Sequence, residues 1–260
     1  MKTSSQKKQL QPSICLFKLN SRLRNDSVFV YSRNIVGENM SYMQLSREGT
    51  VWVLTLTNGE NRLNDDVLAE FNTALDTIEN TEGNGAVVIT SADPKFWSNG
   101  IDLNFVQEKG GMAYLVKEFA PRLDQLLMRI ARFPLPVIAC LNGHAYAGGA
   151  LIAAACDFRT MRADRGRFCF PEVDIKIPFT PIMTEIVRLL PNPTIAWQMA
   201  STGLALGGEE AAKAGVVDKA LGEAELLPTT MAWAAELAKK DRQTYTLIKR
   251  RWRNAFDKFA

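Results

Sequence analysis

The sequence predicts an α/β layer fold in which short buried strands alternate with helices. Runs rich in apolar and β-branched residues at 51–57, 86–90 and 137–141 have the length and composition of strands. A segment with the helical spacing of apolar residues follows each of these runs. Such an alternation is typical of a sheet with mostly parallel connections between its strands.

The first half of the chain contains three expected helices. Residues 65–79 form an amphipathic helix with Asn64 or Asp65 as its cap. After the strand 86–90, the loop 91–100 leads to a helical start after Ile101. A third helical period covers 112–132, and Pro134 and Pro136 precede the next strand.

The centre of the chain combines a strand, a glycine turn and an unusually apolar helix. Strand 137–141 runs into the turn Asn142–Gly143, and Gly148–Gly149 open a helix that ends near Asp157. Because this helix is apolar on every side, we expect it to be buried. Its first turn presents unpaired backbone N–H groups, and the paired glycines allow close approach, so it could bind an anion or a transient oxyanion.

The second half of the chain becomes more polar. We expect strands at 158–161 and 167–170, a helix from Pro181 to about Leu190, and a short turn or strand at 215–218. The last helix, 242–258, carries a run of basic side chains near its middle. We expect this run to form a solvated face or to meet a ligand's phosphates. It consists of Lys249, Arg250, Arg251 and Arg253.

Size and composition limit the class of protein. A chain of 260 residues with 47% hydrophobic residues can bury a sizeable core, and we expect one domain with appendages. No apolar run approaches the roughly 20 residues of a membrane helix, so no membrane anchor is predicted. The net charge is +3, but residues 1–39 hold seven basic and two acidic residues, a balance of +5, which leaves −2 for residues 40–260. The globular part therefore indicates no nucleic-acid surface.

The first 39 residues and the cysteines bear on the compartment. Residues 1–39 are rich in Ser, Lys and Arg and lack the hydrophobic core of a secretory signal. They are either a mitochondrial or plastid transit segment, or a disordered extension upstream of a natural start at Met40 or Met43. The four cysteines show no Cys-x-x-Cys pairing, which favours a reducing compartment. We expect a cytoplasmic protein in a bacterium, a mitochondrial matrix protein if the segment is a transit peptide, and no secretion.

Several common chemistries are absent from the sequence. With the single histidine His144, a histidine metal cluster is excluded, and no Gly-x-Ser-x-Gly elbow accompanies it. Neither a phosphate loop nor a Gly-x-Gly-x-x-Gly fingerprint follows a strand. We expect His144 to cap or hydrogen-bond its turn.

Three segments together resemble the enoyl-CoA hydratase/isomerase (crotonase) family, and the resemblance covers about residues 45 to 260. They are Lys95–Leu103, Ala139–Asp157 and Phe170–Ile177. The resemblance implies a spiral of repeated ββα units with a C-terminal helical region. It also implies three parts: an extension over 1–39, a catalytic core over 40–200 and an oligomerisation region over 201–260.

The resemblance further implies a pair of backbone donors for a thioester oxygen. The matching positions are the N–H groups of Ile101 and Gly148. Proton removal next to a thioester makes an enolate, and donors aimed at its oxygen are often the largest catalytic term, about 3–4 kcal/mol per donor. Candidates for the wall of the acyl-CoA site are Ser98, Asn99, Gly100, Asp102 and Gly149, with Asp102 equally suited to cap a helix.

Two positions decide the expected reaction. Family hydratases use two glutamates to position and activate water, and here the matching positions are Leu151 and Glu172. Hydration needs a water held between two polar groups, whereas moving a double bond needs one base that takes and returns a proton. The apolar Leu151 therefore favours the shift of a double bond over hydration. Separately, Met161–Ile175, Asn142–Ala145 and Arg188 resemble the plant-type delta(3)-delta(2)-enoyl-CoA isomerases of fatty-acid β-oxidation, and this resemblance implies Glu172 as the proton shuttle.

Alternatives stay open on the same scaffold. They are hydration, thioester hydrolysis, decarboxylation, and acyl-CoA binding without catalysis. No metal and no cofactor are expected, since coenzyme A is part of the substrate. The family resemblance implies a homotrimer or dimer of trimers, and the apolar face of the penultimate helix gives weak support. That face consists of Met231, Trp233, Ala234 and Leu237.

Overall fold

The structure is a computed structural model, and it describes residues 42–259. Its main feature is a six-stranded sheet in the order β1-β2-β3-β5-β7-β9. The first two strands pair antiparallel, and every other neighbouring pair is parallel. The strands are β1 (Met43–Glu48), β2 (Val51–Leu56), β3 (Ala86–Ser91), β5 (Val137–Leu141), β7 (Phe158–Arg162) and β9 (Lys219–Leu221).

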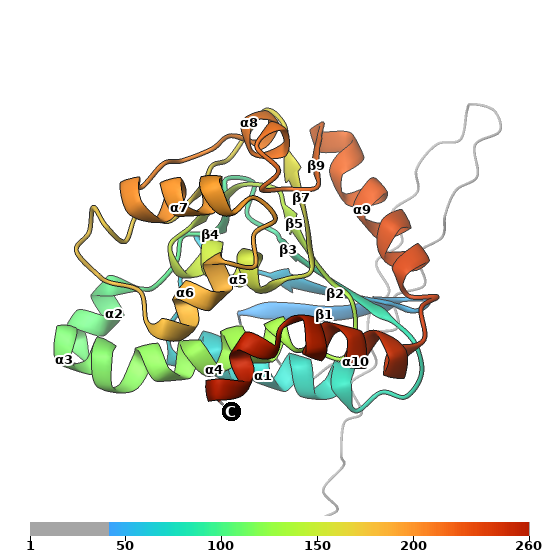
Figure 1. Ribbon diagram of the computed structural model, residues 1–260, viewed down its shortest axis with the longest axis horizontal. Helices are drawn as coiled ribbons and strands as arrows, with labels where there is room; N and C mark the ends of the chain where they lie inside the picture. Colours follow the sequence, from blue (N-terminus) through green and yellow to red (C-terminus); the bar gives the residue numbers. More distant parts are fainter. Residues whose placement is uncertain (1–41, 260) are drawn as a thin grey trace, which may run out of the picture. The chain divides into compact units, whose positions relative to one another are not determined.

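A second, smaller sheet lies beside the first. Its three parallel strands, in the order β4-β6-β8, are β4 (Phe96–Ser98), β6 (His144–Tyr146) and β8 (Phe168–Cys169). Along the chain, a strand of the large sheet is followed three times by a strand of the small sheet and then by helix. This order confirms the predicted α/β class and the repeated ββα units (Figure 1).

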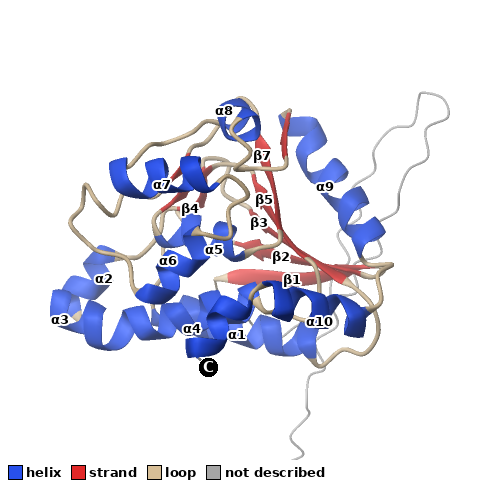
Figure 2. Cartoon of the chain, in the orientation of Figure 1, coloured by secondary structure: helices blue, strands red, loops and turns tan. Residues whose placement is uncertain are grey.

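Helices cover both faces of the large sheet (Figure 2). One face and the helices on it form the main hydrophobic core, to which α1, α4, α5 and α6 contribute. The other face packs against α9 alone, through residues such as Val88, Ile138 and Ala234. The helices are α1 (Asp65–Glu79), α2 (Leu103–Glu108), α3 (Met112–Tyr114), α4 (Ala120–Ala131), α5 (Gly148–Ala155), α6 (Pro181–Val187), α7 (Pro193–Thr202), α8 (Gly208–Lys213), α9 (Glu223–Leu237) and α10 (Arg242–Trp252).

Most elements expected from periodicity are confirmed, with differences at short strands and helix ends. Asn64 caps α1 by accepting a hydrogen bond from Val67 N. The expected helix 112–132 contains a π-helical segment, η1 (Leu115–Phe119), between α3 and α4. The expected strand 167–170 is confirmed as the shorter β8, and the expected turn or strand at 215–218 is a turn. The strands β1, β4, β6 and β9 were not predicted. Strands as short as β4, β6 and β9 offer little periodicity and are defined by their pairing with neighbouring strands.

The expected last helix, 242–258, is wrong at its C-terminal end, and the expected solvated basic face is confirmed only in part. Helix α10 ends at Trp252, and a 3-10 segment, η2 (Asn254–Phe259), follows. Arg250 and Arg251 are exposed, and no ion pair among residues 42–259 includes Arg250. Lys249 and Arg253 are instead buried and paired with Asp157.

The apolar face of the penultimate helix also has a different role from the one expected. Ala234 is buried on the chain's own sheet, and Met231, Trp233 and Leu237 pack around it. The face is therefore used within the subunit. Exposed apolar side chains lie instead on α10, at Leu247, Ile248 and Trp252. The homotrimer or dimer of trimers stays a prediction.

Three cysteines, Cys140, Cys156 and Cys169, are free and buried, in agreement with the expectation of reduced thiols. Within residues 42–259, no helix is both long enough and apolar enough to cross a membrane. The predictions about residues 1–39 lie outside the described residues, and the boundary at residue 200 stays a prediction.

Candidate active site

The entrance to α5 is built on a tight turn after β6. Ala147, the residue before the helix, has φ +48° and ψ −123°, a conformation that non-glycine residues rarely adopt. Its N–H donates to Cys169 O on β8 (3.1 Å), and its carbonyl accepts from Leu151 N (2.9 Å). These bonds fix the strained residue, so Gly148 and Gly149 begin a helix that is buried at every position.

A second loop meets this turn from β4. Leu63 N–H donates to Gly100 O (2.8 Å) and Asp102 N–H donates to Leu63 O (2.9 Å), so Ile101 lies between two fixed peptide groups. Gly100 has φ +76°, and a Cβ added to it would lie 2.8 Å from Tyr146 O and 3.1 Å from Gly148 N. Glycine is therefore required here for both conformation and space.

The two predicted backbone donors lie next to each other. A Cβ on Gly148 would be 3.6 Å from Ile101 N, which places the two loops in contact at these peptides. Neither N–H serves as a donor in the loop and cap hydrogen bonds of residues 42–259. An oxygen that develops negative charge could accept from both. The structure thus brings Ile101 and Gly148 together, while their role as donors stays a proposal.

The remaining wall residues support this junction from within. Ser98 is fully buried; its hydroxyl donates to Asn61 O (2.7 Å) and accepts from Gly100 N (3.3 Å). Gly149 packs on Ser98, since an added Cβ would lie 2.6 Å from Ser98 O. The hydroxyl of Ser98 is thus already engaged inside the protein, and a direct contact with a ligand would require it to exchange partners.

Asn99 and Asp102 lie at the half-buried edge of the same loop. Asn99 Nδ2 donates to Glu60 Oε2 (3.0 Å). Asp102 caps α2, because its Oδ1 accepts from Asn104 N and Phe105 N (both 3.1 Å). The structure confirms the helix-cap alternative for Asp102.

Glu172 is the one predicted site residue with an unpaired ionisable group. It lies in the turn after β8, is 7% exposed, and its Oε2 has no hydrogen-bond partner in the described part of the chain. Burial raises the pKa of this carboxyl to about 7. A buried carboxyl with such a pKa can act as both base and acid near neutral pH.

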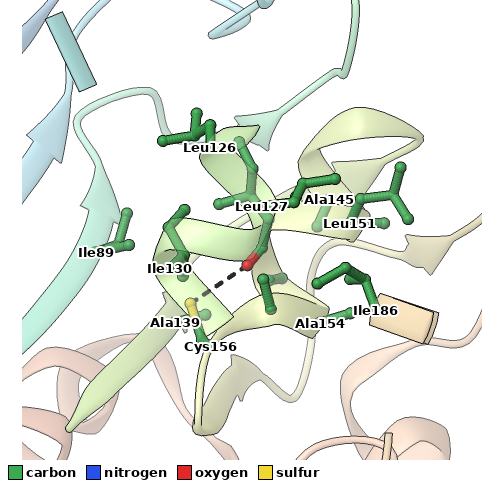
Figure 3. Packing of buried hydrophobic residues seen from close by; sticks show 14 of the residues in the cluster. Ile89, Leu126, Leu127, Ile130, Ala139, Ala145, Leu151, Ala154, Cys156 and Ile186 are labelled. Atoms are coloured by element: carbon green, nitrogen blue, oxygen red, sulfur yellow. Dashed lines mark hydrogen bonds between the residues drawn. The ribbon is translucent and has the colours of Figure 1, made fainter. Parts of the chain in front are cut away.

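Leu151 lies one helical turn beyond Gly148 on α5. It is 1% exposed and belongs to an apolar cluster with residues of α4 and α6 such as Leu127 and Ile186 (Figure 3). A second carboxyl at position 151 would have to be buried against apolar neighbours, so the helix presents no polar group there.

His144 does not use its side chain to hydrogen-bond the turn, contrary to expectation. Its backbone N–H donates to Lys95 O (2.8 Å), but Nδ1 is buried without a partner. The ring packs between Phe96 and Tyr146, with centroids 5.6 and 5.4 Å away. Burial, together with the nearby cations, lowers the pKa of His144. Its role is packing within the small sheet.

Sequence reasoning missed the strained Ala147 and the side chain of Leu63. Leu63 Cδ1 would be 2.9 Å from a Cβ on Gly148, so it closes the junction from the α1 side. A positive φ at Ala147 has no signal in the residue type, because alanine does not favour it. No group of three or more His, Cys, Asp or Glu side chains suited to a metal ion occurs within residues 42–259.

Comparisons with known proteins agree with this architecture. The family model described as enoyl-CoA hydratase/isomerase matches residues 46–259. Enoyl-CoA delta isomerase 3 of Arabidopsis thaliana is 37% identical over 183 residues, 68% of this chain and 75% of that protein. The short-chain-enoyl-CoA hydratase of Clostridium acetobutylicum is 32% identical over 200 residues, 75% of this chain and 73% of that protein.

A solved structure shows the same fold. An enoyl-CoA hydratase/isomerase family protein from Pseudomonas syringae superposes with a TM-score of 0.75 at 26% identity, covering 82% of this chain and 91% of that one. The family model matches most of the chain, and the repeated ββα units and the junction of two glycine turns agree with that match. This chain belongs to the enoyl-CoA hydratase/isomerase family.

Proposed function

We propose that the protein is a delta(3)-delta(2)-enoyl-CoA isomerase, which converts a 3-enoyl-CoA into the 2-trans-enoyl-CoA. The observation that carries the proposal is the contrast between Glu172 and Leu151. One buried carboxyl has an unpaired oxygen and a pKa of about 7, and the position one turn into α5 is apolar. A single acid/base suits a proton transfer between two carbons better than the activation of water.

The proposed reaction has two proton transfers. The Glu172 carboxylate removes a proton from the α carbon, and the electron pair moves through the thioester to its oxygen. The N–H groups of Ile101 and Gly148 donate to this oxygen, with a contribution of about 3–4 kcal/mol each. The Glu172 carboxylic acid then returns the proton to the γ carbon. The double bond moves from C3–C4 to C2–C3, and neither metal nor redox cofactor takes part in these steps.

Replacement of Glu172 by glutamine tests this proposal. Gln has nearly the same shape but no basic oxygen, so we expect turnover of a 3-enoyl-CoA to fall by about 10²–10⁴-fold, the usual contribution of a general acid/base. Asp174→Asn is the matched control, since Asp174 lies exposed in the same turn. It should keep turnover within about twofold. Near-full turnover of Glu172→Gln would refute the assignment.

Hydration is the second candidate, because a hydratase is among the relatives. Assays of the wild-type protein with 3-enoyl-CoA and with 2-trans-enoyl-CoA in parallel distinguish the two. Isomerisation faster than hydration supports the single-carboxyl mechanism. Faster hydration would replace it. Hydrolysis or decarboxylation would appear as free coenzyme A or carbon dioxide, and binding without any turnover would indicate a non-catalytic protein.

A further inference from the structure

Asp124 is a carboxylate in an unusual place. It lies in the middle of α4 on the face that packs against the core, between Leu123 and Leu126, and is 7% exposed. Carboxylates are rarely buried without a cationic partner. No ion pair among residues 42–259 includes Asp124. Burial raises the pKa of Asp124 to about 6, so its charge changes within the range in which proteins work.

The partner of Asp124 is the hydroxyl of Thr180. Thr180 Oγ1 donates to Asp124 Oδ1 (2.8 Å), and the same oxygen accepts from Met183 N (3.0 Å). A hydroxyl has one hydrogen, so the acceptor role toward Met183 leaves that hydrogen for Asp124. Thr180 is the N-cap of α6. The bond therefore joins α4 to the first turn of α6.

Thr180 also ends the segment that begins with Glu172. Within this segment, 171–180, Ile175 N donates to Pro171 O (3.1 Å) and Ile177 N donates to Glu172 O (3.0 Å). These bonds are local. In the described part of the chain, no hydrogen bond other than Thr180–Asp124 links residues 171–180 to an element beyond α6. The position of the Glu172 segment relative to α4 thus depends on one polar tether, together with apolar packing.

The elements packed around Asp124 bring no competing charge to it. Helix α5 has no ionisable side chain, and the charged groups of the other neighbours are exposed or paired elsewhere. Burial and the Thr180 hydrogen bond account for the pKa of Asp124, without a nearby charge. The groups on the neighbouring elements are Lys117 and Glu118 of η1, Asp65, Asp66, Glu70, Asp76 and Glu79 of α1, Glu185 of α6, and Arg122 and Arg129 of α4 itself.

We propose that Asp124 is a positioning residue whose carboxylate, through Thr180, fixes the segment 171–180 so that Glu172 meets the acyl chain, and that protonation of Asp124 loosens this tether. The inference rests on the proposed isomerase function. A hydrogen bond to a carboxylate is roughly twice as strong as one to a neutral acceptor, so protonation weakens the tether without abolishing it. Asp124 touches no reacting atom; it acts through Thr180.

The pH dependence of turnover tests the proposal. Asp124→Asn retains an oxygen for Thr180 but does not titrate. Protonation of Glu172 lowers the rate below pH 7 in both proteins, and only the wild type also protonates Asp124. Between pH 7 and pH 5 we therefore expect wild-type turnover of 3-enoyl-CoA to fall several-fold further than that of Asp124→Asn, with about tenfold as the limit for a group with a pKa near 6. Parallel profiles would overturn the proposal.

Thr180 variants supply a second measurement. Thr180→Val removes the hydroxyl and should lower kcat about tenfold with KM changed less than twofold, whereas Thr180→Ser should restore wild-type kcat. A merely structural role would lower thermal stability without the rescue or the change in pH profile. Equal kcat for wild type and Thr180→Val would contradict the tether.

The rate of trypsin cleavage after the exposed Lys176 measures how firmly the segment 171–180 is held, without any activity assay. At pH 8, Thr180→Val and Asp124→Leu should be cut there several-fold faster than the wild type, and Asp124→Asn, whose amide oxygen is a neutral acceptor, at a rate between that of the wild type and that of Thr180→Val. Unchanged cleavage overturns the tether even if Glu172→Gln is inactive. Conversely, if Glu172→Gln stays active, the isomerase proposal fails, while the cleavage result still decides whether the tether exists.

Discussion

The two ends of α5 differ in how fully their buried polar groups are paired. At the C-terminal end, Asp157 accepts from Val137 N (2.8 Å) and pairs with Lys249 (2.7 Å) and Arg253 (3.1 Å). Arg253 and Arg159 donate to the last carbonyls of the helix. At the N-terminal end, the N–H groups of Ile101 and Gly148 serve as donors in no loop or cap hydrogen bond of residues 42–259.

Buried polar groups are almost always paired in folded proteins, and exceptions call for an explanation. The C-terminal end of α5 is the closed end, because side chains from later in the chain pair its polar groups and support the fold. The N-terminal end is the open end, because it keeps two backbone donors free, as expected if a substrate is to supply their partner. Glu172, in the turn after β8, is also buried with an Oε2 that has no partner in the described residues.

The largest expected effect is a loss of stability when the Asp157 carboxylate is removed from the closed end. Asp157→Ala leaves Lys249 and Arg253 buried without a carboxylate, and we expect the free energy of unfolding to fall by about 3–5 kcal/mol. Urea denaturation measures this. Lys249→Met keeps Arg253 as the partner of Asp157 and should cost less, so it remains informative if Asp157→Ala does not fold.

The control for that experiment is Glu236→Gln. Its pair with Lys239 is exposed on both sides, and such pairs contribute about 0–1 kcal/mol. If the free energy of unfolding falls no further in Asp157→Ala than in Glu236→Gln, the ion pairs at the closed end do not stabilise the fold.

Adding a methyl group at the open end, with Gly149→Ala, should change stability less than Asp157→Ala does, but it should also lower activity. An added Cβ at Gly149 would lie 2.6 Å from Ser98 O. Gly149→Ala should therefore lower the free energy of unfolding by about 1–3 kcal/mol. Because the added methyl group separates the two donor loops, it should also lower turnover about 10²-fold. Gly222→Ala is the control, since its nearest neighbouring atom would be 3.8 Å away. Equal activity of the two variants would show that the junction tolerates displacement.

The sequence alone could predict much of the open end and little of the closed end. The strand, glycine turn and apolar helix around Gly148 are local patterns, and Leu151 and Glu172 were identified because they match family motifs. The partners of Asp157 lie 92 and 96 positions further along the chain, at Lys249 and Arg253. No local periodicity predicts such a pairing, and a run of basic residues on a helix near the C-terminus usually indicates a solvated surface.

Asp124 was missed for the same reason. The role of Asp124 depends on its contact with Thr180, 56 residues away in the sequence. It also depends on burial of the side chain, whereas aspartate is usually exposed. Two short strands of the second sheet, β4 and β6, were missed because pairing with one another, rather than length or alternation, defines them. Local chemistry was therefore predictable, whereas the tertiary contacts that position it were not.

The most direct test of the central claim is the pH dependence of kcat/KM of the wild-type protein with a 3-enoyl-CoA. If Glu172 is the base, the rate should rise through an apparent pKa near 7, with a slope that approaches tenfold per pH unit well below that pKa, and this dependence should be absent from the residual rate of Glu172→Gln. A rate independent of pH between 5 and 8, or the same profile in Glu172→Gln, would contradict the account.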